Sequence, residues 1–452
     1  MVRRLVAMNA TLSLVGLLAA PGGARAQEPA RINVDTYTLP NGLQVILAED
    51  HSAQVVQVDV WYHVGSRNEV RGRTGFAHLF EHMMFQGSAN VAKAQHSALV
   101  TNAGGINNGS TTEDRTNFFE ELPSNRLNLG LWLEAEHMRS LAVTKENFEN
   151  QRQAVKEERR LRVDNQPYLR ALFEDDYGIY DSTTCFPYAH SVIGSMADLD
   201  AAQVEDVQRF YKQYYTPNNA TLAVVGDFTP ADAKKLIQEY FGDIPRGATP
   251  APVECAAKFN TGPVRRHVTD VNANLPAVVQ VFRVPEYRNE DYAALELLQR
   301  IVGGGESSRF NRSLVREKKL AVSPLVLLNP FGPRNDPGVM LLGAIANQGV
   351  SLDSLNAGVT AEIARLASGG VTDAELAKAK NSYRAGVINA RQSVASVAEA
   401  LQTANQFLGN PNAVNGQLDR YMKVTTADIK RVASTYLRPD NSLTLLVSKD
   451  GK

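Results

Sequence analysis

The segment His78-Leu79-Phe80-Glu81-His82 carries the residues best suited to chemistry. On a helix, His78 and His82 stand at positions i and i+4, so both imidazoles project from one face and can bind the same metal ion. Glu81 directly precedes His82 and reaches the same neighbourhood. The spacing therefore predicts a helix over residues 75–86 that offers two metal ligands and one further carboxylate.

The neighbours of this motif are apolar on nearly every side. A helix with such neighbours is buried, and ionisable groups on it are costly unless they pair or coordinate. This setting favours metal binding. The alternative is a pair of core histidines satisfied by hydrogen bonds beside a salt-bridged glutamate. The apolar neighbours are Phe76, Leu79, Phe80, Met83, Met84 and Phe85.

A catalytic zinc ion takes three protein ligands and keeps one position open, so a third ligand must come from elsewhere. Residues 144–163 are predicted to form a helix with Thr144 as its N-cap. Glu158 falls on the apolar stripe of this helix, where a lone carboxylate needs a partner. A metal ion is one such partner, and a buried ion pair with an arginine is the alternative. The stripe consists of Phe148, Gln151, Ala154, Val155, Glu158, Leu161 and Arg162.

Composition limits the classes of protein to consider. The chain has 452 residues, which at roughly 150 residues per domain suggests two or three units. Lys+Arg number 47 and Asp+Glu number 48, so the chain lacks the basic excess of a nucleic-acid binder. Apolar residues make up 44% and charged residues 21%, which is typical of a folded soluble protein. Two cysteines exclude a disulfide scaffold and a cysteine-rich metal site.

Residues 1–26 are predicted to be a secretory signal peptide. Arg3 and Arg4 form a basic start, an apolar stretch follows, and Ala24-Arg25-Ala26 has the pattern of a cleavage site. We therefore expect an exported protein of the bacterial periplasm, with no stable membrane insertion after cleavage. An uncleaved anchor is the alternative, although the apolar run is short for a span of ~20 residues.

Export bears on the two cysteines. An oxidising compartment permits a disulfide between Cys185 and Cys255. Two buried free thiols are the alternative.

The elements that must position these residues mix helices and strands. Residues 245–264 are rich in proline and glycine and predict a linker between an N-terminal domain, 27–244, and a C-terminal domain, 265–452. Before the linker we expect two strands within 37–49, single strands over 54–63 and 220–225, and a strand pair or one extended strand over 107–120. We also expect helices over 124–141 and 144–163. After it we expect strands near 277–284 and 339–344 around a helix near 292–302, then three helices and a last strand.

The pattern after the linker repeats the pattern before it. The sequence DVQRFYKQYYTPNNATLAVV begins at Asp206, and DIKRVASTYLRPDNSLTLLV begins 222 residues later at Asp428. Six positions match in register without a gap, which favours duplication over chance similarity. Because the helices and strands show no regular βαβ alternation, we expect an α+β unit used twice.

The motifs resemble those of the pitrilysin and mitochondrial processing peptidase family. Residues 78–82 match the inverted zinc motif of the inverzincins. In that family the third ligand is a glutamate some 76 residues after the second histidine, which here is Glu158, the residue that the helical stripe selects independently. The resemblance covers nearly all of the mature chain. Its motifs are VGSRNEVRGRTGFAHLFEHMMFQGS from Val64, NQRQAVKEERR from Asn150, VIGSMADL from Val192, YYTPNNATLAVVGDF from Tyr214 and GGGESSRFNRSLVREK from Gly303.

The resemblance implies a fold and an activity. The fold would be two tandem homologous α+β domains, each a mostly antiparallel sheet packed with helices. One Zn²⁺ per chain would be held by His78, His82 and Glu158, and Glu81 would be the general base of a zinc endopeptidase. Peptides would add as a strand along residues 106–112. The substrate-contacting residues there would be Asn108, Gly109 and Ser110, with Arg316 from the second domain.

Main-chain pairing of this kind accepts many sequences, so it predicts oligopeptide substrates and weak sequence specificity. An ordinary edge strand without a ligand is the alternative.

The sequence departs from the family pattern at two points. Gln151 stands where many relatives have a glutamate, so any role of that charge is lost. Active members also carry an Arg and a Tyr in the second domain; here Arg316 is present, but Val322 stands at the tyrosine position. Because some relatives divide the site between two chains, we expect the catalytic subunit of a heteromeric peptidase whose homologous partner supplies the Arg/Tyr pair. A non-catalytic scaffold or peptide-binding subunit of the same fold is the alternative.

Overall fold

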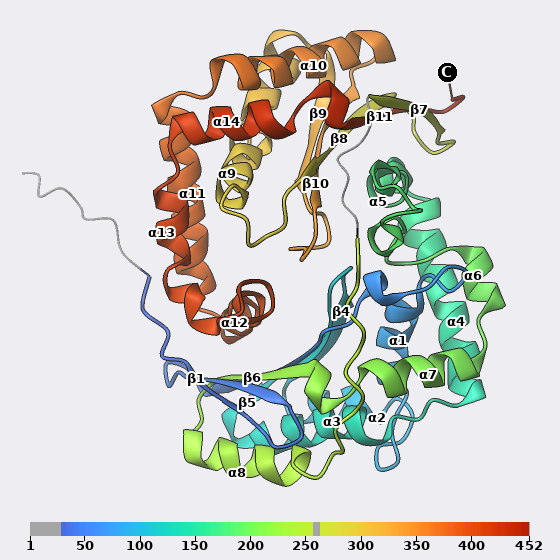
Figure 1. Ribbon diagram of the computed structural model, residues 1–452, viewed down its shortest axis with the longest axis vertical. Helices are drawn as coiled ribbons and strands as arrows, with labels where there is room; N and C mark the ends of the chain where they lie inside the picture. The colour runs from blue at the N-terminus through green and yellow to red at the C-terminus, as the bar shows by residue number, and fades with distance from the viewer. Residues whose placement is uncertain (1–28, 256–262, 452) are drawn as a thin grey trace, which may run out of the picture.

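The computed structural model describes residues 29–255 and 263–451, so the predicted signal peptide lies outside the described residues. The chain forms two β-sheets, each packed with helices, in two halves that lie one above the other in Figure 1. This α+β architecture confirms the predicted fold class. Among the described residues, no helix has the length and apolar character needed to cross a membrane.

The first sheet has six strands in the order β1-β2-β6-β3-β5-β4. β2 and β6 run parallel, and the other neighbours run antiparallel. Among the described residues, β4 is therefore an edge strand with a strand partner on one side only. One face of the sheet packs on α1, α3, α7 and α8 around Val58, Val60 and Phe80. The strands are β1 (Asp35–Thr38), β2 (Gln44–Glu49), β3 (Val55–Tyr62), β4 (Ile106–Thr111), β5 (Thr116–Pro123) and β6 (Ala220–Gly226).

Helices of the first half are short and are separated by irregular turns. The helix predicted over 144–163 is α-helical only to Arg159 and continues as a π-helical turn over Arg160–Asp164. The helices are α1 (Phe76–Met84), α2 (Gln95–Asn102), α3 (Leu127–Ser140), α4 (Lys145–Arg159), α5 (Leu169–Phe173), α6 (Met196–Ala201), α7 (Val204–Tyr214) and α8 (Pro230–Phe241).

The second sheet has five strands in the order β7-β11-β8-β10-β9. If β1 is set aside, this order and its single parallel pair repeat those of the first sheet. β7 and β9 were not expected from the sequence. The strands are β7 (Val264–Thr269), β8 (Ala277–Val284), β9 (Ala321–Leu328), β10 (Gly338–Ala346) and β11 (Ser442–Ser448).

The expectation of three helices after residue 344 is wrong, because five helices precede β11. Glycine, proline and N-capping residues divide the predicted helices into more pieces; Ser393 and Thr425, for example, each accept a hydrogen bond from the backbone N–H three residues on. The helices of this half are α9 (Tyr292–Gly303), α10 (Leu352–Gly369), α11 (Asp373–Ala390), α12 (Val394–Leu408), α13 (Gln417–Met422) and α14 (Thr426–Tyr436).

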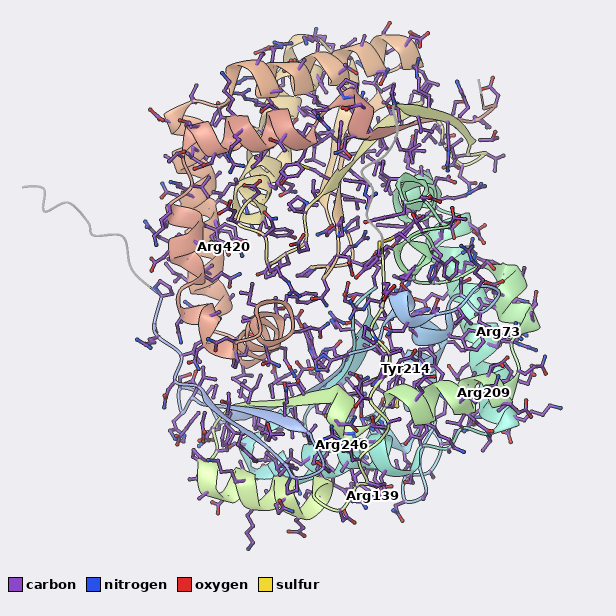
Figure 2. The ribbon with its side chains drawn as sticks, in the orientation of Figure 1. Arg73, Arg139, Arg209, Tyr214, Arg246 and Arg420 are labelled. Atoms are coloured by element: carbon purple, nitrogen blue, oxygen red, sulfur yellow. A yellow bond between two sulfur atoms is a disulfide. The ribbon has the colours of Figure 1, made fainter. Side chains whose placement is uncertain are left out.

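The structure confirms the internal repeat residue by residue. α14 and β11 begin and end 222 residues after α7 and β6. The side-chain amides of Asn219 and Asn441 each donate a 2.8 Å hydrogen bond to the carbonyl of the last helical tyrosine, Tyr214 or Tyr436. Figure 2 labels Tyr214 and Arg209, two residues of the first copy. The repeated residues thus build the same helix–turn–strand corner twice.

Each half also covers the other half's sheet. α12 belongs to the second half, yet Val397, Ala398 and Leu401 pack on Ile46 and Ala223 of the first sheet. Residues 169–188 of the first half pack in turn on the second sheet, and α5 lies beside β7 and β11 in Figure 1. Cys185 in this segment forms a disulfide with Cys255, so the bonded alternative is the one observed. The two sheets therefore share their outer layers.

Asp59 lies buried on β3 under α12, in a hollow that Glu399 also lines. Burial, with Glu399 nearby, raises the pKa of Asp59 to about 8 despite the hydrogen bond from Asn117 and the charge of Arg115. The folded chain therefore keeps a proton that the unfolded chain releases near its ordinary pKa of about 4. The contribution of Asp59 to folding stability is fully present below a pH of about 4 and is lost as the pH rises towards about 8.

We expect Asp59→Asn to be more stable than the unchanged chain, by an amount that grows between pH 5 and pH 8. The growth should be at most about 1.4 kcal/mol per pH unit. Denaturant unfolding at several pH values measures it. A stability difference that stays constant over this range would contradict the prediction.

Candidate metal centre

Helix α1 is fixed at its first turn by a buried carboxylate. Glu69 accepts hydrogen bonds of 2.8 Å from the backbone N–H groups of Gly75 and Ala77. Gly75 has a φ of 87°, and a side chain there would meet the carbonyl oxygen of Ile193 at 2.7 Å, so only glycine fits this start. The buried face of α1 then packs through Phe80 on Tyr211 and Tyr215. These contacts set the direction in which the polar face of the helix points.

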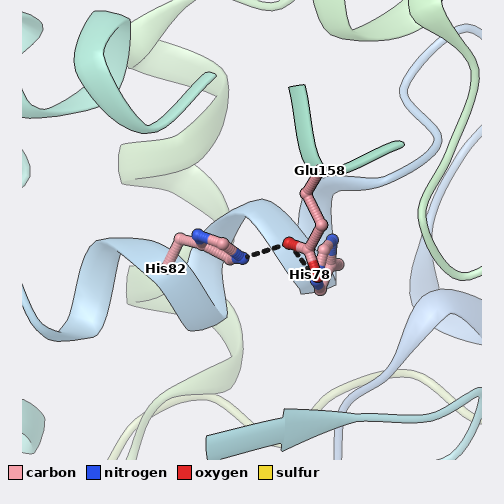
Figure 3. Close-up of side chains that lie close together, drawn as sticks. All are labelled: His78, His82 and Glu158. Atoms are coloured by element: carbon pink, nitrogen blue, oxygen red, sulfur yellow. Dashed lines mark ion pairs between the residues drawn. The ribbon is translucent and has the colours of Figure 1, made fainter. Parts of the chain in front are cut away.

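The structure brings His78, His82 and Glu158 together, as Figure 3 shows. Glu158 Oε2 lies 3.0 Å from His82 Nε2 and 3.6 Å from His78 Nε2. Two ligands that bind zinc tetrahedrally at about 2.1 Å are themselves roughly 3.4 Å apart. The two separations from Glu158 therefore bracket that of a zinc ligand set, and all three donor atoms lie within 4.8 Å of one another.

Glu158 reaches the histidines from α4, which begins where Thr144 Oγ1 accepts a hydrogen bond from the Asn147 N–H. Its second oxygen lies 2.9 Å from Arg162, an exposed side chain. The ion pair with an arginine, which the sequence offered as the alternative partner, is thus present but at the surface. The oxygen facing the histidines stays available. The hydrogen bond with His82 is the main cause that lowers the pKa of Glu158.

The protonation state of His78 also suits a metal ion. Burial, reinforced by the neighbouring His82, lowers the pKa of His78 to about 4. The imidazole is therefore neutral at neutral pH, as ligation requires. Two imidazole nitrogens and one carboxylate oxygen are a set that zinc accepts readily. The residues thus fit the implied ion by chemistry as well as by spacing.

Glu81 lines the same cavity as the three ligands and is held by β4. Thr111 Oγ1 donates a 2.6 Å hydrogen bond to Glu81 Oε2. Burial raises the pKa of Glu81, although this hydrogen bond opposes the shift. Gly109 makes room for the carboxylate, since a side-chain carbon there would lie 3.2 Å from Glu81 Cγ. Alternation along β4 places Gly109 and Thr111 on the same face, so the strand pattern could have revealed Thr111 as the residue that orients Glu81.

A cavity of about 860 Å³ joins the ligands to the edge strand. Asn108, Gly109 and Ser110 line it beside Glu81, and Gln151 lines it near Glu158. Sequence reasoning missed its apolar wall, because those residues come from distant segments and carry no shared motif. Phe331, from the second half, lies 5.2 Å from the ring of Phe173. The other apolar residues of the wall are Phe85, Leu161, Val163, Leu169, Val192 and Ile193.

Arg316 is the one predicted site residue that lies apart from this cavity. It stands on the π-helical turn Asn311–Glu317 and forms an ion pair with the exposed Glu306. Val322 on β9 is 47% exposed and offers no polar group. Within the described residues, the second half therefore brings neither an arginine nor a tyrosine from these positions to the cavity.

An inverted zinc motif on a buried helix, beside the edge strand of a duplicated α+β fold, is the arrangement of a metallopeptidase class. Comparison with known families agrees. Residues 44–178 match the family described as "Insulinase (Peptidase family M16)", and residues 201–383 match "Peptidase M16 inactive domain".

Individual relatives extend the match to the whole chain. The zinc protease PqqE of Helicobacter pylori is 31% identical over 99% of this chain and 98% of its own length. The crystal structure of a protease from Helicobacter pylori superposes with a TM-score of 0.87 at 30% identity, covering 93% of this chain and all of that one. A probable mitochondrial-processing peptidase subunit beta of Arabidopsis thaliana is 23% identical over 88% of this chain and 75% of its own length. The chain belongs to peptidase family M16.

Thr111 provides a test of the site geometry. Thr111→Val removes the hydroxyl that holds Glu81 while keeping the shape of the side chain. We expect peptidase kcat/KM to fall about 10- to 100-fold with no change in zinc content, because the carboxylate loses its orientation and the ligands do not. Thr111→Ser, the matched control, should stay near the unchanged chain. Equal activity of the two variants would show that the hydrogen bond has no catalytic importance.

Proposed function

We propose that the chain is a zinc-dependent endopeptidase that cleaves oligopeptides with Glu81 as general base. The observation that carries this proposal is the convergence of His78, His82 and Glu158 within 4.8 Å of one another, beside the half-buried carboxylate of Glu81 and an edge strand. The relatives named as zinc proteases support the same activity.

The residues divide the work of hydrolysis. A zinc ion bound by His78, His82 and Glu158 would lower the pKa of water towards ~7 and polarise the scissile carbonyl. Glu81, half-buried and oriented by Thr111, accepts the proton of the attacking water and passes it to the leaving amine. Its raised pKa suits this exchange, because a base must also release the proton.

The edge strand β4 supplies the place for the peptide. Its inner side pairs with β5, and its other side has no strand partner within the described residues. An extended peptide can add there by main-chain hydrogen bonds, with Asn108, Gly109 and Ser110 beside it. The apolar wall that includes Val192 and Phe331 would receive apolar side chains of the substrate. Affinity from the main chain gives weak sequence specificity.

We further propose that this chain is the catalytic subunit of a heteromeric enzyme that is exported to the periplasm. The position of Arg316 against Glu306, and the valine at 322, support a partner that supplies an Arg/Tyr pair. The match of residues 201–383, which span the end of the first half and much of the second, to an "inactive domain" is in keeping with this division. The same match also favours the alternative of a non-catalytic scaffold. A scaffold, however, would not require Glu81 beside three metal ligands.

Substitutions separate the base from the ligands. Glu81→Gln should lower kcat by about 10²- to 10⁴-fold and leave the metal in place, because the amide cannot accept the proton. Glu158→Gln should lose one zinc equivalent together with activity. Glu157→Gln is the matched control, because Glu157 is adjacent to Glu158 in the sequence but its carboxylate pairs with Arg160 at the surface. Metal analysis beside peptide cleavage gives the result, and full activity of Glu81→Gln would refute the proposed mechanism.

The heteromer is tested by activity with and without its partner. The purified chain alone should bind zinc but cleave peptides slowly. Addition of the homologous subunit co-purified from the native host should raise kcat/KM at least tenfold, because it completes the substrate contacts. Full activity of the lone chain would show that no second subunit is needed.

A further inference from the structure

A second group of side chains of metal-ligating types lies in the core of the first half. His96 comes from α2, Glu120 from β5, and Glu134 and His137 from α3. The exposed fractions of these four side chains are only 0–3%. Donor atoms of His96, Glu120 and Glu134 all lie within 4.8 Å of one another. Nothing in the proposed hydrolysis uses any of them.

Several donor atoms of this cluster lack hydrogen-bond partners. His96 Nε2 lies 2.9 Å from Glu120 Oε1. Both ring nitrogens of His137 are buried without a hydrogen bond among the described residues, and so are both oxygens of Glu134 and Oε2 of Glu120, apart from a proton that the two carboxylates could share with each other. His137 Nδ1 nevertheless lies 3.3 Å from Glu134 Oε1, so it points into the cluster. Buried polar atoms are rarely left unsatisfied, so this group calls for a ligand.

The charges of the cluster also lack a counterion. Two other buried carboxylates of this chain face a guanidinium: Glu113 faces Arg334 and Asp114 faces Arg67. Among the described residues, the ion-pair contacts of Glu120 and Glu134 are with histidines alone. Two buried carboxylates without a cation are costly, and they must share a proton or bind a cation.

The histidines are poorly placed to supply that charge. The rings of His96 and His137 stack at 4.3 Å with an interplanar angle of 10°. Two protonated imidazoles at this distance would repel each other. This stacking favours at least one neutral ring. A neutral imidazole has a free nitrogen lone pair and is a metal ligand.

We propose that His96, Glu120 and Glu134 bind a second divalent transition-metal ion of the zinc class, with His137 as the adjacent fourth donor. Imidazole nitrogen and carboxylate oxygen together are a donor set of such ions. Structural zinc sites are closed by protein ligands, whereas catalytic sites keep an open position. The first site opens on a cavity, and this cluster does not line it. The second ion would therefore be structural and would join α2 and α3 to β5.

The cluster contacts Phe85, at the end of the helix that carries the zinc motif. The ring of Phe85 stands 5.7 Å from that of His96 and 6.1 Å from that of His137, in edge contact with both. Phe85 follows α1 directly and lines the active cavity. An ion here would fix the layer on which the end of the zinc-motif helix rests.

Metal content of the full mature chain, folded in the presence of Zn²⁺, tests the proposal. We expect two zinc equivalents per chain, and one in His82→Ala. Glu134→Gln should also retain one, while the matched control Glu136→Gln, whose carboxylate instead accepts hydrogen bonds from Ser88, Asn90 and Ser140, should retain two. In the His82→Ala chain, chelation should lower Tm and added zinc should restore it. If zinc did not bind at His78, His82 and Glu158, the unchanged chain would hold one zinc equivalent. His82→Ala would then retain this equivalent and Glu134→Gln would lose it.

A measurement without substitutions covers the case in which Glu134→Gln does not fold. Anomalous scattering at the zinc edge from crystals of the zinc-loaded chain should give a peak between His96, Glu120 and Glu134. A single equivalent that disappears in His82→Ala, or no peak in the core, would overturn the proposal. A Glu134→Gln chain with unchanged metal content and higher Tm would also overturn it, because the glutamates would then be sharing a proton.

Discussion

The candidate site depends on one contact between two helices: the carboxylate of Glu158 on α4 must meet the imidazoles that α1 presents. Neither helix alone holds three ligands, so their mutual position decides whether a metal ion can be bound. That position is set away from the ligands. Glu69 fixes the first turn of α1, the aromatic stack around Phe80 fixes its depth, and Thr144 fixes the start of α4. Metal binding therefore depends on the contacts that fix the first turns of α1 and α4 and on the packing of Phe80 in the core.

Much of this arrangement could be predicted from the sequence, because it follows from short-range patterns. The i, i+4 spacing of His78 and His82 and the stripe through Glu158 are consequences of helical geometry. The repeat was readable because the same turn residues stand at Pro217 and Pro439. What could not be predicted depends on long-range packing. The apolar face of α12 was visible in its sequence, but nothing in that face says that it covers the first sheet.

The two clusters of histidine and glutamate show how burial changes the role of the same side chains. His78, His82 and Glu158 keep 13–26% of their side-chain surface exposed and border a cavity. His96, Glu120 and Glu134 are closed off by the sheet and two helices. A peptide can reach the first group and not the second. Phe85 stands between them, so the shape of the cavity and the state of the core are physically linked.

The exchange of α12 and residues 169–188 between the halves constrains how substrates can enter. Swinging the halves apart about residues 245–264 would strip Leu401 from Ile46 and Ala171 from the second sheet, exposing both apolar layers to water. The disulfide from Cys185 further tethers the linker to one of these layers. The shared layers therefore oppose a hinge motion between the two halves. In the heteromer proposed above, opening and closing around a peptide would then come from movement of this chain against its partner.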